Sequence, residues 1–344
     1  NHYHSDLLVA INFMFQFSLK KIQVKYILSL VIIGMITSAI AGNFKSKGNL
    51  AQAESKPKVV ASHNVICNLV QTIAQDTVDL TCLIDADQDP HTYNPTPLDR
   101  KAIEEAQLIF YGGYELEPQV TKLLSATKTP KIALYEQVVT KPLMVAENHH
   151  DESDESAEKP ELEPDPHVWH NIENTVKMVE LIQSIFLQAN PEAAGQYLVN
   201  STILTEQLWQ LDAWIKDQIA TIPERQRVLV TTHDSLNYYV KAYYFKDYQT
   251  LQGLSDESSP TASQVRKLSA EIKQTGVPTI FAEATASDRV LQNIARAADV
   301  KLSTEKLYAD GLGEAKSYIE MMSHNTCAIA NGLGGECKAF TPGK

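Results

Sequence analysis

Residues 228–234 read Val-Leu-Val-Thr-Thr-His-Asp, an apolar run that ends in polar side chains. A short continuous apolar run with a polar boundary is typical of a buried strand. A helical pattern follows around Ser235–Tyr243, so this part of the chain predicts a strand, a short loop and a helix. His233 lies in that loop, directly after the strand. This is where side chains at the carboxyl end of a parallel sheet line a ligand-binding crevice.

The same alternation of strand and helix extends over most of the 344 residues. Expected strands are Lys58–Ser62, Val78–Ile84, Leu108–Gly112, Lys131–Leu134, Arg227–Thr232, Tyr248–Leu251, Thr279–Glu283 and Lys301–Leu307. Expected helices are Val65–Ala74, Pro97–Ala106, Pro118–Ala126, Ser235–Tyr243, Thr261–Thr275, Ala286–Ala297 and Ser317–Asn331, with Pro97 and Pro118 in first turns. This pattern predicts an α/β fold of two lobes with mainly parallel sheets.

Residues Pro191–Ile222 contain almost no helix breaker after Gly195 and carry apolar residues at helical spacing. They predict one long helix that joins the two lobes. A plain surface helix of the second lobe is the alternative, because a periodic pattern does not exclude it.

Two nearly identical tripeptides, Asp89-Pro90-His91 and Asp165-Pro166-His167, each place an imidazole just after a conformationally restricted Pro. Together with His233 and Asp310, they give four candidate metal donors that lie 76, 66 and 77 residues apart. This spacing excludes a compact zinc finger, whose ligands come in close pairs. Three imidazoles and one carboxylate form a set that zinc accepts in tetrahedral geometry. Alternatively, Asp-Pro is a common turn initiator, and His is often an ordinary, partly buried residue.

Several motifs of the chain match a known family in order and spacing. The matching segments are Asp89-Pro90-His91-Thr92-Tyr93-Asn94-Pro95-Thr96-Pro97, Asp165-Pro166-His167-Val168-Trp169, Val228-Leu229-Val230-Thr231-Thr232-His233-Asp234, Ile280-Phe281-Ala282-Glu283 and Tyr308-Ala309-Asp310-Gly311-Leu312. From about Lys58 to Leu333, the chain resembles the periplasmic metal-binding proteins of zinc- and manganese-uptake ABC importers. The resemblance implies one metal in a cleft between two lobes, bound by His91, His167, His233 and Asp310.

The resemblance also bears on the metal and on the type of function. In that family the third ligand is His in zinc-type members and Glu in typical manganese-type members, so His233 favours Zn²⁺ as cargo, with Mn²⁺ or Fe²⁺ as alternatives. The implied function is capture of the ion and delivery to an ABC permease and its ATPase, without catalysis. A zinc-dependent hydrolase with Glu283 as base is a weaker alternative, because a fourth protein ligand leaves no open position for water. Neutral imidazoles are required, so metal affinity is expected to fall below pH ~6.5.

Charge and composition agree with an exported binding protein. The formal net charge of −12 argues against nucleic acid as a partner, because phosphate binding needs clustered Lys and Arg. The N-terminal part predicts an export signal. Its positive region is Lys20, Lys21 and Lys25, its apolar run is Tyr26–Ile40, and its cleavage site is Ala39-Ile40-Ala41. An uncleaved membrane anchor is the alternative. The first Cys is Cys67, far from the cleavage site, so we expect no lipid-attachment Cys. We further expect a soluble, monomeric periplasmic protein that meets the membrane only through its permease.

The four Cys residues fit an oxidising compartment and allow three pairings. Of these, Cys67–Cys82 with Cys327–Cys337 is preferred. Free thiols or a zinc site formed by Cys remain alternatives, although no Cys-x-x-Cys spacing supports the latter.

Residues that support the ligands are less evident from the sequence. Glu283 ends a strand and is a candidate acceptor for the second ring nitrogen of a ligand. Asp89, Asp165 and Asp234 are candidates for the same role, although capping of turns is the preferred role for them. An unligated role is expected for His63. His170 and His324 are expected at helix boundaries or at the surface, so replacing His170 should leave zinc binding unchanged.

The segment 147–165 holds nine acidic residues, one Lys and the pair His149-His150, and it predicts a mobile loop. Zinc-type relatives often carry a His-rich loop here, but this segment is acidic instead. At most it collects cations weakly, and a solvated linker is the alternative. The expected organisation is an export segment at 1–41, a linker at 42–57, a first lobe at 58–190, the long helix at 191–222 and a second lobe at 223–344.

Overall fold

The computed structural model describes residues 56–146, 162–254 and 261–343. The predicted export segment 1–41 and residues 147–161 of the predicted acidic loop 147–165 lie outside these residues. The end of that loop was wrongly predicted as mobile, because Leu162–Pro164 form a strand and Asp165 is buried. Contacts divide the chain after Glu54, and everything described here belongs to the unit Ser55–Lys344. No helix among the described residues has the length and apolarity needed to cross a bilayer.

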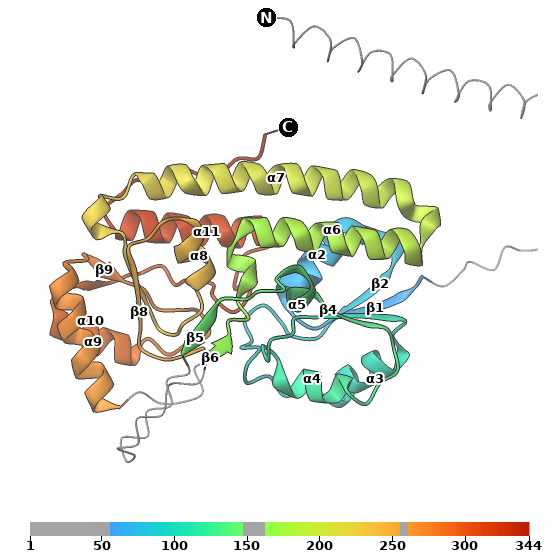
Figure 1. Cartoon of the computed structure of the whole chain (residues 1–344), viewed down its shortest axis with the longest axis horizontal. Helices are drawn as coiled ribbons and strands as arrows, with labels where there is room; N and C mark the ends of the chain where they lie inside the picture. The colour runs from blue at the N-terminus through green and yellow to red at the C-terminus, as the bar shows by residue number, and fades with distance from the viewer. Residues whose placement is uncertain (1–55, 147–161, 255–260, 344) are drawn as a thin grey trace, which may run out of the picture. The chain divides into compact units, whose positions relative to one another are not determined.

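The first lobe is built on a parallel four-stranded sheet in the order β2-β1-β3-β4 (Figure 1). Its strands are β1 (Lys58–Ala61), β2 (Asp79–Cys82), β3 (Leu108–Tyr111) and β4 (Lys131–Ala133). Its helices are α2 (Asn64–Ala74), α3 (Pro97–Glu105), α4 (Pro118–Leu124) and α5 (Leu134–Val138). Pro97 and Pro118 occupy first turns as predicted, and Thr96 and Asp99 form a capping box on α3.

The second lobe repeats this plan with shorter strands. Its strands are β7 (Val228–Thr231), β8 (Asp247–Thr250), β9 (Thr279–Ile280) and β10 (Lys301–Leu302). Its helices are α8 (Asn237–Ala242), α9 (Ala262–Thr275), α10 (Arg289–Ala298) and α11 (Tyr318–Gly332). The parallel pairs β7–β8 and β9–β10 are linked by a backbone hydrogen bond from Phe281 N to Val230 O. The second half of the chain therefore forms the predicted parallel α/β lobe.

Three elements that the sequence did not reveal lead to α6. The antiparallel strands β5 (Met144–Ala146) and β6 (Leu162–Pro164) flank the acidic stretch, and a 3-10 turn, η3 (Val168–His170), precedes α6 (Ile172–Ala189). Helix α6 begins where Asn171 caps it by accepting a hydrogen bond from Glu173 N.

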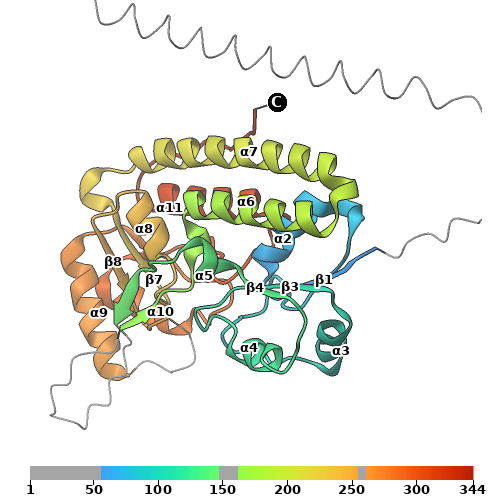
Figure 2. The same cartoon turned by 45° about the vertical axis from the view of Figure 1, so that its right-hand side comes forward.

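Helix α7 (Ala194–Ala220) is the long helix expected between Pro191 and Ile222. Its 27 residues span about 40 Å, and it runs beside α6 and α11 in both views (Figures 1 and 2). Its buried stripe consists of Leu204, Leu208, Leu211, Ile215 and Ile219. This stripe follows helical spacing, which is why the helix was predictable.

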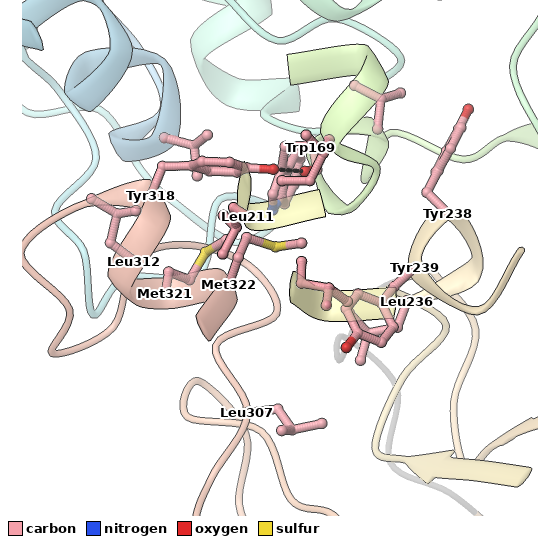
Figure 3. Packing of buried hydrophobic residues seen from close by; sticks show 14 of the residues in the cluster. Trp169, Leu211, Leu236, Tyr238, Tyr239, Leu307, Leu312, Tyr318, Met321 and Met322 are labelled. Carbon is pink, nitrogen blue, oxygen red and sulfur yellow. Dashed lines mark hydrogen bonds between the residues drawn. The ribbon is translucent and has the colours of Figure 1, made fainter. Parts of the chain in front are cut away.

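One apolar core runs through both lobes. Figure 3 shows Leu211 of α7 with Met321 and Met322 of α11 in this cluster, near Trp169. The hydroxyl of Tyr318 donates to Trp169 O at 2.6 Å, which ties α11 to the turn before α6. Disulfides join Cys67 to Cys82 and Cys327 to Cys337, the pairing preferred from sequence.

Candidate metal centre

Four side chains that are far apart in the sequence meet at one buried point. Each of His91, His167, His233 and Asp310 offers a ligand atom, and these atoms all lie within 4.8 Å of one another. His91 comes from the loop after β2 and His167 from the turn between β6 and η3, while His233 follows β7 and Asp310 lies between β10 and α11. His91, His233 and Asp310 thus follow strands of the parallel sheets, as expected for ligands at their carboxyl ends, whereas His167 follows the antiparallel strand β6.

The three imidazoles converge through their Nε2 atoms on Oδ1 of Asp310. The distances from Asp310 Oδ1 are 3.6 Å to His91, 3.4 Å to His167 and 3.1 Å to His233. The Nε2 atoms of His91 and His167 are 3.2 Å apart. Zinc–ligand bonds of about 2.0–2.1 Å at tetrahedral angles separate the ligand atoms by about 3.3–3.4 Å. Four of the six distances between donor atoms, 3.1–3.6 Å, are therefore close to those of a tetrahedral zinc site, and all six lie within 4.8 Å.

The ring of His233 is fixed by Glu283. Oε1 of Glu283 accepts hydrogen bonds from the backbone N–H groups of Thr232 (3.0 Å) and His233 (3.1 Å). Oε2 of Glu283 accepts from Nδ1 of His233. This keeps the proton on Nδ1 and leaves Nε2 free to bind a metal. Glu283 thus supports a candidate ligand, as the sequence suggested.

The two Asp-Pro-His turns are built differently. Asp165 Oδ1 accepts from both Nδ1 (2.8 Å) and the backbone N–H (2.9 Å) of His167. Asp89 instead accepts from the backbone N–H of His91 (2.8 Å) and the hydroxyl of Thr92 (2.9 Å). The turn-capping role preferred from sequence therefore describes Asp89, but it is incomplete for Asp165, which also orients a ring.

Asn237 connects the third of these acidic residues to the site. Its amide donates to Asp165 Oδ2 at 3.0 Å and to Asp234 Oδ1 at 2.9 Å. Asp234 therefore accepts a hydrogen bond from Asn237 within a local turn, and its hydrogen bonds described here do not include one to an imidazole ring.

The Asp310 carboxylate has a partner that sequence reasoning missed. The hydroxyl of Thr285 donates to Asp310 Oδ2 at 2.9 Å, on the side away from the imidazoles. This hydrogen bond leaves Oδ1 as the oxygen that faces the three rings. No motif marks Thr285, which lies in the segment between β9 and α10.

Two further histidines contact the backbone around Asp310. Nε2 of His63 donates to Asp310 O and Nε2 of His170 donates to Ala309 O, both at 2.8 Å. Both rings are fully buried. His170 lies at a helix boundary as expected, because it ends η3 just before α6, but it is not at the surface. His324, on α11, donates from Nε2 to Lys306 O and is partly buried.

The surroundings of four buried histidines shift their pKa values in two opposite directions. Burial alone lowers the pKa of His167, but hydrogen bonds to Asp165 and Asp310 outweigh it and raise the pKa to about 9. For His233, burial is likewise outweighed by Asp310 and Glu283, so its pKa lies well above the usual value. Burial dominates at His63 and His170 and lowers their pKa values to about 4 and about 3. Those two rings are therefore neutral at pH 7.

The pKa of the Asp310 carboxyl is lowered by its surroundings. Burial raises its pKa, but His233, His167 and His91 together hold the pKa well below the usual range. In the metal-free protein the centre is thus an ionised carboxylate next to the protonated rings of His167 and His233, and a metal ion that binds there takes the place of their Nε2 protons.

One side of the centre borders a cavity of about 250 Å³. His91, which is 7 % exposed, lines it together with Tyr114, Glu115, Glu163 and Pro166. His167 and His233 have no exposed surface. The described residues therefore give the centre an approach from the His91 side.

Comparisons with known proteins identify the family and the fold. Residues 59–332 match the family model ZnuA, described as zinc-uptake complex component A, periplasmic. The solved periplasmic zinc-binding protein TroA from Treponema pallidum has a TM-score of 0.72 and 28% identity, and the match covers 81% of this chain and 99% of that chain. The predicted two-lobed α/β fold is confirmed by this likeness.

Two curated relatives are named as metal-binding or metal-transport lipoproteins, and one of them names manganese. The manganese-binding lipoprotein MntA of Halalkalibacterium halodurans is 27% identical over 281 residues, which are 80% of this chain and 88% of that protein. The metal ABC transporter substrate-binding lipoprotein SsaB of Streptococcus sanguinis is 28% identical over 315 residues, covering 89% and 97%. Because both are named lipoproteins, these names do not support our expectation that the chain lacks a lipid anchor.

The family match covers most of the chain and includes all four residues of the buried cluster. The resemblance seen in the sequence motifs is therefore confirmed by the family model and by the fold. The chain belongs to the ZnuA family of periplasmic zinc-uptake complex components.

Proposed function

We propose that this protein captures Zn²⁺ outside the cytoplasm and delivers it to an ABC permease. The observation that carries the proposal is the buried cluster of three imidazole Nε2 atoms around Oδ1 of Asp310. His91, His167, His233 and Asp310 are the proposed ligands. Zinc accepts nitrogen-rich tetrahedral sets of this kind.

Two features favour zinc over manganese. The third donor, His233, is an imidazole, and softer nitrogen donors suit zinc, whereas oxygen donors suit manganese. Thr285 engages Oδ2 of Asp310, which favours coordination by Oδ1 alone and therefore a low coordination number. Four of the six distances between the donor atoms, 3.1–3.6 Å, are close to those that four zinc bonds of ordinary length produce.

Manganese is the second candidate cargo, because a similar protein is named manganese-binding. Divalent affinities generally rise from manganese through iron towards zinc, so binding of manganese alone would not exclude zinc. The two candidates share the fold, the site and the transport role, and they differ only in the ion.

The hydrolase alternative is disfavoured by the position of Glu283. Both of its carboxylate oxygens already accept hydrogen bonds: Oε1 from the backbone N–H groups of Thr232 and His233, and Oε2 from Nδ1 of His233. A general base needs a free lone pair within reach of the attacking water. A supporting role for Glu283 suits a binding protein.

Delivery to a permease would depend on limited lobe movement. We assign 58–190 and 223–344 to the two lobes and 191–222, which contains α7, to the connection between them. A continuous helix that packs along one face against α6 and α11 resists bending, so release is expected to involve small displacements of the ligand-bearing loops. The proposed partners are the permease and its ATPase, with the chain acting as a monomer.

The test is a metal competition on chelator-stripped protein, with zinc and manganese supplied together at buffered free concentrations and bound metal counted by mass spectrometry. We expect one zinc per chain, loss of zinc in His233→Ala, and unchanged binding in His324→Ala. Retention of manganese in place of zinc would move the proposal to the second cargo. Protein that binds neither metal would overturn the site.

A further inference from the structure

Two histidines outside the proposed ligand set hold the peptide that carries Asp310. His63 follows β1, and its Nε2 lies 2.8 Å from Asp310 O. His170 ends η3, and its Nε2 lies 2.8 Å from Ala309 O. A carbonyl oxygen only accepts, so both rings carry their proton on Nε2 and donate it. Two consecutive carbonyls are thus held by two imidazoles.

These contacts join different parts of the fold. His63 belongs to the first lobe, and His170 precedes α6, which packs on α2 and α5 of that lobe. The segment they hold follows β10 of the second lobe. The two hydrogen bonds therefore cross from one lobe to the ligand-bearing segment of the other.

Asn64 adds a third contact to the same segment. Its Oδ1 accepts from Leu312 N at 2.9 Å, and its Nδ2 donates to Asp85 O at 3.2 Å. A Cβ at Gly311 would lie 2.6 Å from Asn64 Nδ2, so only glycine permits this approach. The backbone from Ala309 to Leu312 is thus seated closely against the first lobe, while the Asp310 side chain is held by Thr285.

The far sides of the two rings are also constrained. The hydroxyl of Tyr135 lies 2.6 Å from Nδ1 of His63 and donates to it, because that nitrogen has no proton in the neutral ring. Trp169 packs against both rings, with centroid distances of 4.8 Å to His63 and 5.3 Å to His170. Trp169 also lies 5.4 Å from the ring of His167. One aromatic cluster thus links a proposed ligand to both donors.

We propose that His63 and His170 are positioning residues that fix Asp310 against the three imidazoles and slow metal release. The proposal rests on the proposed function, because it requires Asp310 to be a ligand. It replaces the sequence-based expectation that His170 is dispensable. Without either donor, a buried carbonyl of the Asp310 segment loses its partner, and the segment shifts to recover one.

Paired substitutions separate positioning from ordinary packing. In His63→Gln, the amide nitrogen of the longer side chain comes near the position of Nε2 and retains the donor. In His63→Asn, the shorter side chain reaches only the position of Nδ1. We expect His63→Asn to speed zinc dissociation into excess chelator about tenfold, and His63→Gln to stay within about threefold of the wild type. The same order is expected for His170→Asn and His170→Gln.

A double-substitution cycle provides the decisive readout. If His63 and His170 act through Asp310, their Asn variants should change zinc affinity less than twofold in an Asp310→Ala background. Equal losses in both backgrounds, or equal behaviour of the Asn and Gln variants, would overturn the proposal. Circular dichroism of each variant confirms folding, and the Gln variants keep the test valid if an Asn variant does not fold. A wild type that binds zinc while no variant differs from it would overturn this inference alone, whereas a wild type that binds neither zinc nor manganese would overturn the proposed function as well.

Discussion

Nδ1 of His233 donates a hydrogen bond to Glu283, and Nε2 of the same ring lies 3.1 Å from Oδ1 of Asp310. The two partners of the His233–Glu283 hydrogen bond come from different strands, because His233 follows β7 whereas Glu283 continues the extended segment after β9. Neighbouring strands of the second lobe thus supply the proposed ligand and the carboxylate that fixes its tautomer.

Glu283→Gln should weaken zinc binding about 10- to 100-fold, the usual range for loss of a residue that orients a ligand. The amide –NH₂ would face Nδ1 of His233 and favour the tautomer with its proton on Nε2, where the metal binds. Competition with a fluorescent chelator measures the change. Glu173→Gln, on the exposed face of α6, is the control and should have no effect. Unchanged affinity in Glu283→Gln would remove Glu283 from the site.

The two Asp-Pro-His turns offer a matched comparison. Asp165→Asn should weaken zinc binding about tenfold or more, because Asp165 accepts from Nδ1 of the His167 ring. Asp89→Asn should weaken it less than about threefold, because Asp89 accepts only from the turn groups of His91 and Thr92 in the contacts described above. Isothermal titration of both variants decides the point. Equal losses of zinc affinity would mean that binding depends on the structure of the turns and not on the hydrogen bond that orients the His167 ring.

Thr285→Val should reduce the preference for zinc over manganese about tenfold. The substitution preserves shape but frees Oδ2 of Asp310, and a carboxylate with two free oxygens suits a metal that takes more oxygen ligands. Thr285→Ser keeps the hydroxyl and should behave as the wild type. The measurement is the ratio of bound zinc to bound manganese in mixed buffers, and a ratio unaffected by valine would show that the hydroxyl has no part in selectivity.

Much of this architecture was predictable, and the reasons are local. The strand around Val228–Thr231 and the helix Ala194–Ala220 follow from apolar runs and helical spacing with clear boundaries. The hairpin of β5 and β6 was missed because three-residue strands beside an acidic stretch leave almost no periodic signal. The predicted strands Thr279–Glu283 and Lys301–Leu307 are regular over only two residues each, although Glu283 and Leu307 still pair by a bridge.

The site was predictable to a different extent. The four proposed ligands were found because they lie in motifs that resemble a family. Thr285, His63 and His170 were not, because their roles depend on which segment folds against them. His63 and Asp310, for example, are separated by 247 residues. No local sequence pattern predicts a hydrogen bond to a distant backbone carbonyl.

A buried carboxyl in the first lobe predicts the pH dependence of stability. Burial raises the pKa of Glu117 to about 7, although its Oε1 accepts from Ser62 Oγ and Gly112 N, both at 2.6 Å. The unfolded chain releases this proton near pH 4.5, so the contribution is complete below that pH and is lost as the pH rises through about 7. Between these values the metal-free protein should lose roughly 3 kcal/mol of unfolding free energy from this group.

Glu117→Gln isolates this contribution. Urea unfolding in the presence of chelator should show that the variant gains stability over the wild type as the pH rises from 5 to 8. A difference between the two proteins that is the same at both pH values would contradict the raised pKa. The comparison does not involve the proposed ligands, since both proteins retain them.

The central claim is that Zn²⁺ binds to three imidazoles and one oxygen of Asp310. X-ray absorption at the zinc edge of the loaded protein tests it most directly. The account predicts four ligand atoms at about 2.0–2.1 Å, of which three are imidazole nitrogens, and one imidazole fewer when His233→Ala is loaded at zinc concentrations far above those of the competition. Six light ligands at longer distances, or a spectrum that His233→Ala leaves unchanged, would contradict it.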